Sequence, residues 1–329
     1  MASRFSEVRP RLVAVVDHRF ADLSAERSIL AKVGAELVDL RGASDDEVIE
    51  ACADAEGILL GARFQFTRER IARLGRCRVI ARYGVGFDNV DVAAADEMGI
   101  AVTFVPDYCV EEVANHAMTL LLALHRHLID FDARLRGGNP GIPAEFVVPR
   151  LSGCTLGVLG FGRIGAEVGR RARAFGLRIA AYDPYLPEGT ILAAGAVPVS
   201  LEEAIGESEF VSLHFPLNNS TRHVIDAAAI ARMRPGAFII NVARGGLVDE
   251  EALADAIRSG RLGGAGLDVT EIEPLPADNP LRTLPGVILT PHVAWLSTGA
   301  REELQVKTAE EAVRVLRGEP ARHQAHLTH

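Results

Sequence analysis

In the first third of the chain, short hydrophobic runs alternate with longer segments in which apolar residues recur at helical spacing. The runs are LVAVVD, AELVDL, GILLG, RVIARYG and IAVTFV, and the segments between them include ADLSAERSILAKVG and VDVAAADEMG. Short apolar runs favour buried strands, and strands that alternate with amphipathic helices favour a parallel sheet with helices on both faces. The pattern predicts an α/β fold with a doubly wound parallel sheet.

The segment after Pro106, CVEEVANHAMTLLLALHRHL, has too many apolar residues for one helical stripe. They occupy positions 110, 113, 114, 117, 118, 120, 121, 122 and 124. A helix that is apolar around most of its circumference is buried on most of its surface. We expect this helix to pack against another domain or another subunit. Residues 131–150 are rich in Gly, Pro and Arg, and we expect them to form a loop after it.

A second series of strand-like runs begins with TLGVLG and continues through RIAAYD, FVSLHF, AFIINVA, GGAGLDV and GVILTPH. A final amphipathic segment, TGAREELQVKTAEEAVRVLRG, follows the last run. Two such series predict two α/β domains. We expect the final helix to return to the first domain, so that residues 1–106 and 296–329 form one domain and residues 107–295 form the other.

Composition agrees with two domains and excludes some partners. A chain of 329 residues is long for one compact domain, and a hydrophobic content of 48% can fill two cores. The 35 basic and 44 acidic residues give a net charge of −9, so the chain lacks the basic face that DNA and anionic membranes require. Its apolar runs are too short to span a bilayer, and no basic-then-apolar leader precedes the first run. We expect a soluble, cytoplasmic protein that binds neither nucleic acid nor membrane.

The spacing of cysteine and histidine argues against a metal site. Cys52, Cys77, Cys109 and Cys154 form no CxxC motif and have no neighbouring histidines at the spacing of metal ligands. We interpret them as reduced structural thiols, and we expect no metal.

The segment GVLGFGRIG places Gly160, Gly162 and Gly165 between a strand-like run and a helical segment. Glycines at this spacing permit a tight turn and a close approach of the backbone to a pyrophosphate, which the following helix N-terminus attracts. The next run ends in Asp183, 23 positions after the first glycine, where a carboxylate binds adenosine ribose hydroxyls. The alternative is a glycine-rich turn followed by an ordinary loop aspartate. Asp183 also repels a 2′-phosphate, and the next residues, PYLPEG, contain no arginine, so the pattern favours NAD over NADP.

Three charged side chains follow three successive strand-like runs: Arg244 after FIINVA, Glu273 after AGLDV and His292 after VILTP. In a doubly wound sheet, ligands bind at the carboxyl ends of the strands. Arginine binds a carboxylate through two parallel hydrogen bonds, histidine exchanges a proton near neutral pH, and a carboxylate beside the histidine favours its charged form. Singly, these residues also suit a polar turn, a solvated loop and a buried histidine. Their placement at one edge favours a catalytic set.

Three further segments each have two possible interpretations. YGVGFDNVD contains Gly84 and Gly86 but no third glycine, so it forms either a turn that caps a strand or a substrate-binding loop. His214 in LHFPL is either a packed strand terminus or a residue that lines the cofactor site. Residues 61–66, GARFQF, are candidates for contact with the substrate side chain. There, Arg63 either binds an acidic or phosphorylated group or is a solvated loop arginine.

These segments resemble, in order and spacing, the D-isomer-specific 2-hydroxyacid dehydrogenases. The resemblance covers nearly the whole chain and rests on YGVGFDNVD, GVLGFGRIGAEVGRRARAFGLRIAAYDPY, LHFPLNNSTRHVI, FIINVARGGLVDEEAL, GGAGLDVTEIEP and TPHVAWLS. It is strongest for phosphoglycerate dehydrogenase-like members and for the C-terminal-binding proteins, whose HxAW motif is similar to His292, Ala294 and Trp295. Formate dehydrogenases have a glutamine where this chain has Glu273. Long phosphoglycerate dehydrogenases have a C-terminal regulatory domain for which we expect no room after residue 320.

The resemblance implies a flavodoxin-like substrate domain made from both chain ends, a Rossmann cofactor domain inserted between them, and a homodimer formed largely through the cofactor domain. It implies that Arg244 binds the substrate carboxylate, that His292 is the acid–base group, and that Glu273 pairs with His292. The other implied substrate-binding positions are the backbone around Gly84 and Val85, and Trp295.

The resemblance also implies a set of cofactor-binding residues. Within it, Arg163 and Ile164 would meet the pyrophosphate, Asp183 the ribose and Asp268 the nicotinamide amide. The whole set is Gly160, Gly162, Arg163, Ile164, Gly165, Asp183, His214, Phe215, Pro216, Thr221, Val242, Ala243, Arg244, Asp268, His292 and Ala294.

The sequence therefore predicts an NAD-dependent oxidoreductase that transfers a hydride between NAD(H) and a D-2-hydroxy acid or 2-oxo acid. The alternative is a dimeric binding protein that responds to NAD(H), like the C-terminal-binding proteins, with little or no turnover. The same three catalytic residues persist in both groups, so they do not separate the two hypotheses.

Overall fold

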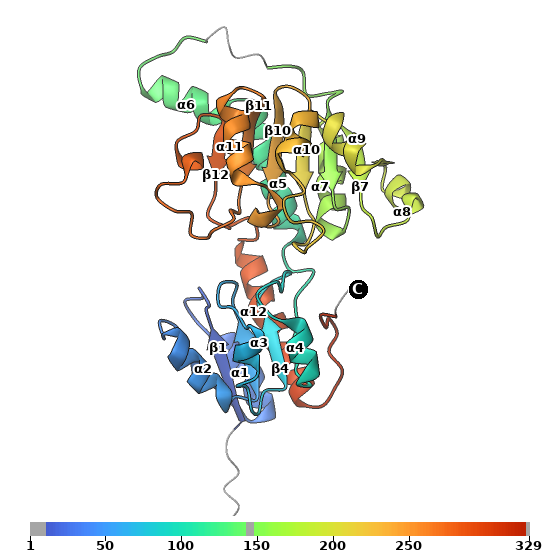
Figure 1. Cartoon of the computed structure of the whole chain (residues 1–329). Coiled ribbons are helices and arrows are strands. Elements are labelled where there is room, and N and C mark those ends of the chain that lie inside the picture. Colours follow the sequence, from blue (N-terminus) through green and yellow to red (C-terminus); the bar gives the residue numbers. More distant parts are fainter. Residues whose placement is uncertain (1–10, 143–147, 327–329) are drawn as a thin grey trace, which may run out of the picture. The chain divides into compact units, whose positions relative to one another are not determined.

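The computed structural model describes residues 11–142 and 148–326, and Figure 1 shows the chain coloured along its sequence. The chain divides into two compact units, one made of Met1–Tyr108 with Ser297–His329 and the other of Cys109–Leu296. It leaves the first unit after Tyr108 and re-enters it after Leu296, whereas we expected crossings after residues 106 and 295. Each unit has its own parallel sheet and its own hydrophobic core, so the predicted α/β class is confirmed.

The first unit contains a five-stranded parallel sheet in the order β2-β1-β3-β4-β5. Helices α1 and α12 pack on one face, and α2, α3 and α4 supply apolar residues to the core on the other face. The chain winds in opposite directions from β1 to β2 and from β1 to β3, and ligands bind at the carboxyl edge of such a switch point. The elements are β1 (Arg11–Val16), α1 (Ser24–Leu30), the 3₁₀ helix η1 (Ala31–Val33), β2 (Ala35–Asp39), α2 (Asp45–Ala53), β3 (Gly57–Leu60), α3 (Arg68–Ile71), β4 (Val79–Arg82), α4 (Val92–Glu97), β5 (Ala101–Thr103) and α12 (Thr298–Leu316).

The second unit contains a seven-stranded parallel sheet in the order β12-β11-β10-β9-β6-β7-β8. Helices α5 and α7 pack together on one face, and α9, α10 and α11 pack next to one another on the other face. The strands are β6 (Thr155–Leu159), β7 (Arg178–Tyr182), β8 (Val197–Pro198), β9 (Phe210–Leu213), β10 (Ala237–Asn241), β11 (Leu262–Leu267) and β12 (Val287–Leu289). The helices are α5 (Val110–His125), α6 (Leu128–Arg136), α7 (Arg163–Ala174), α8 (Glu188–Ala193), α9 (Leu201–Gly206), α10 (Ala227–Arg232), η2 (Gly245–Leu247), α11 (Glu250–Arg258) and η3 (Pro280–Arg282).

Helix α5 is buried, but by its own unit rather than by another domain or subunit as we expected. It lies on β10 and β11 and beside α7. A Cβ on Gly266 of β11 would lie 2.9 Å from Cβ of Leu120, so the glycine lets the helix approach the sheet closely. No helix of the described residues is long and apolar enough to cross a membrane.

The prediction that residues 131–150 form a loop is wrong in its first part, because α6 continues to Arg136. His127, at a φ of +47°, ends the preceding turn and starts this helix in a new direction. Arg136 forms an ion pair with Asp132 four positions earlier, which supports a helical turn. The Gly and Pro residues that suggested a loop are concentrated after Arg136. Residues 143–147 of the segment lie outside the described residues.

Candidate active site

The turn between β6 and α7 is built around the three glycines of GxGxxG. Gly160 has a φ of +91°, and a Cβ there would lie 2.8 Å from the carbonyl carbon of His214. A Cβ on Gly165 would lie 2.0 Å from the carbonyl oxygen of Gly160, whereas Gly162, the N-cap of α7, faces open space. Two glycines close the turn, and the third leaves the start of α7 open to a ligand. This cradle fits a pyrophosphate, with Arg163 and Ile164 as the first residues of the helix.

Asp183 follows β7 and lies beside this turn. Its Oδ2 atom accepts a hydrogen bond from the Phe161 N–H at 2.8 Å, and its Oδ1 atom accepts one from the Tyr185 N–H at 2.9 Å. The residue is partly exposed. Because each carboxylate oxygen can accept more than one hydrogen bond, Asp183 can bind ribose hydroxyls and still hold the glycine-rich turn.

The remaining expected cofactor residues lie at the carboxyl edge of the same sheet. Nε2 of His214 lies 2.9 Å from Ser212 Oγ, and burial lowers the pKa of His214 to about 3, so this imidazole is neutral near pH 7. The other positions at this edge are Phe215, Pro216 and Thr221 after β9, Val242, Ala243 and Arg244 after β10, Asp268 after β11, and His292 and Ala294 after β12.

The structure brings Glu273 and His292 together. They follow the neighbouring strands β11 and β12, and Nδ1 of His292 lies 2.8 Å from Oε2 of Glu273. Burial alone would raise the pKa of Glu273, but its hydrogen bond to His292 and the charges of His292 and Arg244 lower it below the usual value. Glu273 is therefore ionised at neutral pH, and it can hold the imidazole in one orientation.

Arg244 follows β10, which pairs with β11, so it comes from the strand next to that of Glu273. Asn241, the last residue of β10, fixes the backbone there, because its Nδ2 donates to the carbonyl of Arg244 at 2.9 Å and its Oδ1 accepts from the Ala243 N–H at 3.1 Å. Nη1 of Arg244 donates to the carbonyl of Ala243 at 2.8 Å. Its charge is close enough to Glu273 to lower the pKa of that carboxyl.

The backbone of His292 is held in the left-handed region, at a φ of +57°. This conformation costs a non-glycine residue about 1–2 kcal/mol, so the surrounding contacts must enforce it. The His292 N–H donates to the carbonyl of Asp268 at 2.8 Å, and Trp295 Nε1 donates to the carbonyl of His292 at 3.2 Å. The Asp268 carboxylate is buried and accepts hydrogen bonds from the backbone of Val293 at 2.9 Å and Ala294 at 2.8 Å. Asp268 therefore fixes the loop that carries His292.

Two histidines near these residues were not singled out from the sequence. Nε2 of His116 on α5 lies 2.9 Å from Oγ1 of Thr290, which in turn donates to Asp268 at 2.5 Å. His223 forms an ion pair with Glu271, two positions before Glu273. Neither contact has a sequence signal, because the partners are far apart in the chain and follow no common spacing.

In the first unit, Gly84 and Val85 follow β4. Gly84 has a φ of +142°, and a Cβ there would lie 2.1 Å from Nη1 of the buried Arg82, so only glycine fits. The hydroxyl of Tyr83 donates to the buried carboxylate of Glu26 at 2.9 Å. Buried side chains therefore fix the turn. This arrangement is compatible with both a strand cap and a substrate-binding loop.

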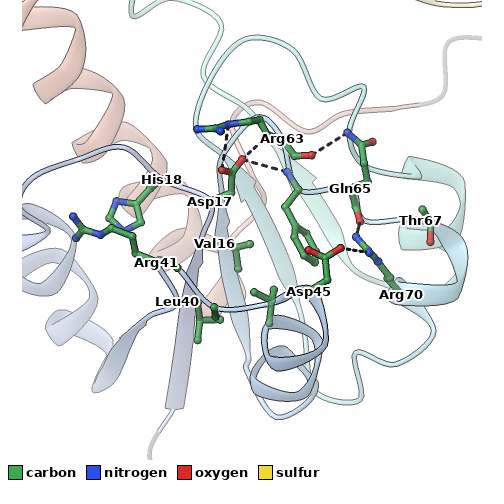
Figure 2. A pocket seen from close by; sticks show the side chains of 14 residues that line it. Val16, Asp17, His18, Leu40, Arg41, Asp45, Arg63, Gln65, Thr67 and Arg70 are labelled. Atoms are coloured by element: carbon green, nitrogen blue, oxygen red, sulfur yellow. Dashed lines mark hydrogen bonds and ion pairs between the residues drawn. The ribbon is translucent and has the colours of Figure 1, made fainter. Parts of the chain in front are cut away.

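A pocket of about 630 Å³ opens at the carboxyl ends of β1, β2 and β3, the switch point of this sheet (Figure 2). Arg63 lies at one side of it with its Nε 3.7 Å from Asp17, and Asp17 also accepts the backbone N–H groups of Arg63 and Phe64. On another side Arg70 pairs with Asp45 (Figure 2). Arg41, the third arginine of the lining, pairs with Asp39 at 2.9 Å. Because all three arginines pair with carboxylates, the pocket does not favour a phosphorylated ligand over an uncharged one.

Metal ligands do not cluster in the described part of the chain: no group of three or more His, Cys, Asp or Glu side chains there is arranged to hold an ion.

Comparisons with known proteins agree with this geometry. The family model for the D-isomer specific 2-hydroxyacid dehydrogenase NAD binding domain matches residues 118–294. The D-3-phosphoglycerate dehydrogenase of Methanocaldococcus jannaschii is 42% identical over 294 residues, which cover 89% of this chain and 56% of that protein. The chain spans about half the length of the curated relatives it matches.

Two solved structures are similar along nearly their whole length. A glyoxylate reductase from Paecilomyes thermophila has a TM-score of 0.87 and 32% identity, and the match covers 96% of this chain and 98% of that one. The D-lactate dehydrogenase from Aquifex aeolicus, complexed with NAD and lactic acid, has a TM-score of 0.84 and 30% identity, and the match covers 93% of this chain and 96% of that one.

Proposed function

The chain belongs to the D-isomer specific 2-hydroxyacid dehydrogenase family, and from this premise we propose that it transfers a hydride between NAD(H) and C2 of a D-2-hydroxy acid or 2-oxo acid. The observation that carries the proposal is the 2.8 Å contact between His292 and Glu273 at the carboxyl edge of the sheet that also bears the glycine-rich turn. An acid–base pair and a nucleotide cradle at one edge of one sheet are what such a reaction requires.

In this proposal each charged residue has one task. Arg244 binds the substrate carboxylate and thereby orients C2. His292 donates a proton to the carbonyl oxygen during reduction and removes it from the hydroxyl during oxidation, so charge does not accumulate on that oxygen. Glu273 keeps Nδ1 of His292 hydrogen-bonded, which assigns Nε2 to the proton exchange.

The cofactor site fits NAD. Bound NADH supplies the hydride for reduction, and the family model that matches this unit is an NAD binding domain. The cradle at Gly160, Gly162 and Gly165 suits the pyrophosphate, and the carboxylate of Asp183 suits an unphosphorylated ribose. The roles assigned to individual cofactor residues rest on this fit and on the family resemblance.

A homodimer formed largely through the second unit is part of the proposal. Helix α6 exposes apolar side chains, with 59% of Leu128, 55% of Ile129 and 65% of Leu135 accessible. Exposed apolar residues gathered on one short helix support an interface.

A reducing compartment such as the cytoplasm is also part of the proposal. It is supported by the four cysteines, which are buried thiols.

Turnover of a panel of 2-oxo acids with NADH tests the proposal. At least one acid should be reduced far above background, with NADH oxidised in equal amount. The binding-protein alternative predicts tight NADH binding without reduction of any acid. Neither the curated relatives nor the structures named above favour that alternative.

A further inference from the structure

The loop between β11 and Pro274 places two carboxylates against two histidines from different parts of the chain. Glu273 contacts His292, which follows β12. Glu271, two positions earlier, forms an ion pair with His223, which lies between β9 and α10. The first pair is the proposed acid–base pair, and the second has no part in the proposed chemistry.

His223 is fixed in the segment that runs alongside the turn after Arg244. Its φ of +50° is in the left-handed region, and its N–H donates to the carbonyl of Gly246 at 2.8 Å. Two residues on, the N–H of Ile225 donates to the carbonyl of Leu247 at 3.1 Å. The same chain segment also contains Pro216 and Thr221, which precede His223 and belong to the expected cofactor site. His223 is therefore rigidly connected to the turn after Arg244.

The loop that carries Glu271 is held at several points. The N–H of Glu271 donates to Oε1 of Glu250 at 2.6 Å, and Oε2 of Glu250 accepts from Asn279 at 2.9 Å. A Cβ on Gly245 would lie 2.0 Å from the carbonyl carbon of Thr270, so the two backbones are in close contact. The hydroxyl of Thr270 donates to the carbonyl of Ile272, the residue before Glu273, at 2.9 Å. A shift of Glu271 would thus move Thr270 and change how Glu273 is held.

We propose that His223 and Glu271 are positioning residues that keep Glu273 against His292. The inference rests on the proposed function for its catalytic meaning, but the contacts on which it depends are independent of turnover. His223 anchors Glu271, Glu271 fixes the backbone of the adjacent Thr270, and Thr270 holds the carbonyl of Ile272, the residue before Glu273. Loss of the His223–Glu271 pair lets Glu273 spend less time in contact with His292, so the imidazolium form of His292 is less favoured.

Replacement of His223 should change the titration midpoint of His292 in opposite directions, depending on whether His223 acts through its charge or by positioning Glu273. This difference makes the inference testable. The charged groups around the pair are Glu250, which binds the Glu271 backbone, Arg222, next to His223, and Arg244 and Glu273 on the adjoining turns. Replacement of His223 removes a potential cation and leaves Glu271 without that partner. Both changes would favour imidazolium at His292 and raise its titration midpoint if they acted by charge alone. Loss of positioning lowers the midpoint.

The experiment is an NMR titration of the His292 imidazole in the full chain, with the resonance assigned by its loss in His292→Gln. His223→Asn is the main variant, because asparagine tolerates a positive φ but is too short to reach Glu271. We expect it to lower the titration midpoint of His292 below that of the parent chain. His223→Gln, which keeps a donor near the position of Nε2, should restore much of the shift. Asp132→Asn, which breaks an exposed ion pair on α6, is the matched control and should change nothing.

A double variant shows whether the effect passes through Glu273. In the Glu273→Gln background, His223→Asn should cause no further fall, because the group that it positions has already lost its charge. An unchanged or raised midpoint in His223→Asn, or an equal fall in the Glu273→Gln background, would overturn the inference. A chain that reduces no 2-oxo acid would instead overturn the proposed function, and the titration would still be interpretable.

Discussion

Nδ1 of His292 lies 2.8 Å from Oε2 of Glu273, although the two residues follow different strands and are separated by 19 positions in the chain. The contact exists because β11 and β12 are parallel neighbours, so the segments that leave their carboxyl ends start side by side. The buried Asp268 carboxylate then accepts hydrogen bonds from the loop after β12 and so fixes the backbone of His292. Sheet topology therefore creates the pair, and Asp268 orients it.

Replacement of Asp183 should change the choice of cofactor. Asp183→Asn removes the charge that repels a 2′-phosphate but keeps an oxygen that can accept the N–H of Phe161. The ratio of kcat/KM with NADP(H) to kcat/KM with NAD(H) should rise by about tenfold or more. Glu207→Gln is the matched control, because it removes an exposed acid at the C-cap of α9, and it should leave the ratio unchanged. A constant ratio in Asp183→Asn would show that Asp183 does not contact the ribose.

Arg244→Lys should weaken the hold on the substrate carboxylate. A lysine keeps the charge but loses the planar pair of N–H donors. We expect kcat/KM for the 2-oxo acid to fall by about tenfold or more, with little change in NADH affinity. Steady-state kinetics and a separate NADH titration measure the two effects. A loss confined to NADH binding would assign Arg244 to the cofactor.

His214 should make stability depend on pH. Its folded pKa of about 3 lies below the ordinary value of 6.5, so between these values the unfolded chain binds a proton that the folded chain does not. The free energy of unfolding should therefore decrease as the pH falls from about 6.5 towards 3, and this contribution should be constant above 6.5. His214→Gln, which can still hydrogen-bond Ser212, should show a shallower fall of Tm with acidification. Parallel Tm curves for parent and variant would contradict the burial of a neutral imidazole.

The sequence predicts most of the fold because the strands of a buried parallel sheet are continuous apolar runs. It also predicts the edge that bears Arg244, Glu273 and His292, because each follows such a run. It does not predict β8, because a strand of two residues forms no apolar run. It also does not predict α6, because the segment that contains the end of this helix is rich in Gly and Pro residues that follow the helix.

Contacts between side chains are harder to predict than edges. The ion pair of His223 with Glu271 and the hydrogen bond of His116 with Thr290 join segments that are brought together only by packing. Asp268 fixes the His292 loop by accepting hydrogen bonds from backbone N–H groups. Every residue except proline has such a group, so the residue types do not reveal these bonds. Local pattern therefore gives the elements and their ends, whereas the arrangement within the site requires the fold.

The most direct test of the proposed acid–base pair is the pH profile of kcat/KM for 2-oxo acid reduction in the parent and in Glu273→Gln. Reduction requires the protonated form of His292, so the parent profile should be high at low pH and fall as pH rises. Glu273→Gln removes the charge that favours imidazolium, and the falling limb should move to lower pH. Oxidation of the hydroxy acid should show the opposite pH trend. A profile of Glu273→Gln that coincides with that of the parent would contradict the pairing of Glu273 with His292.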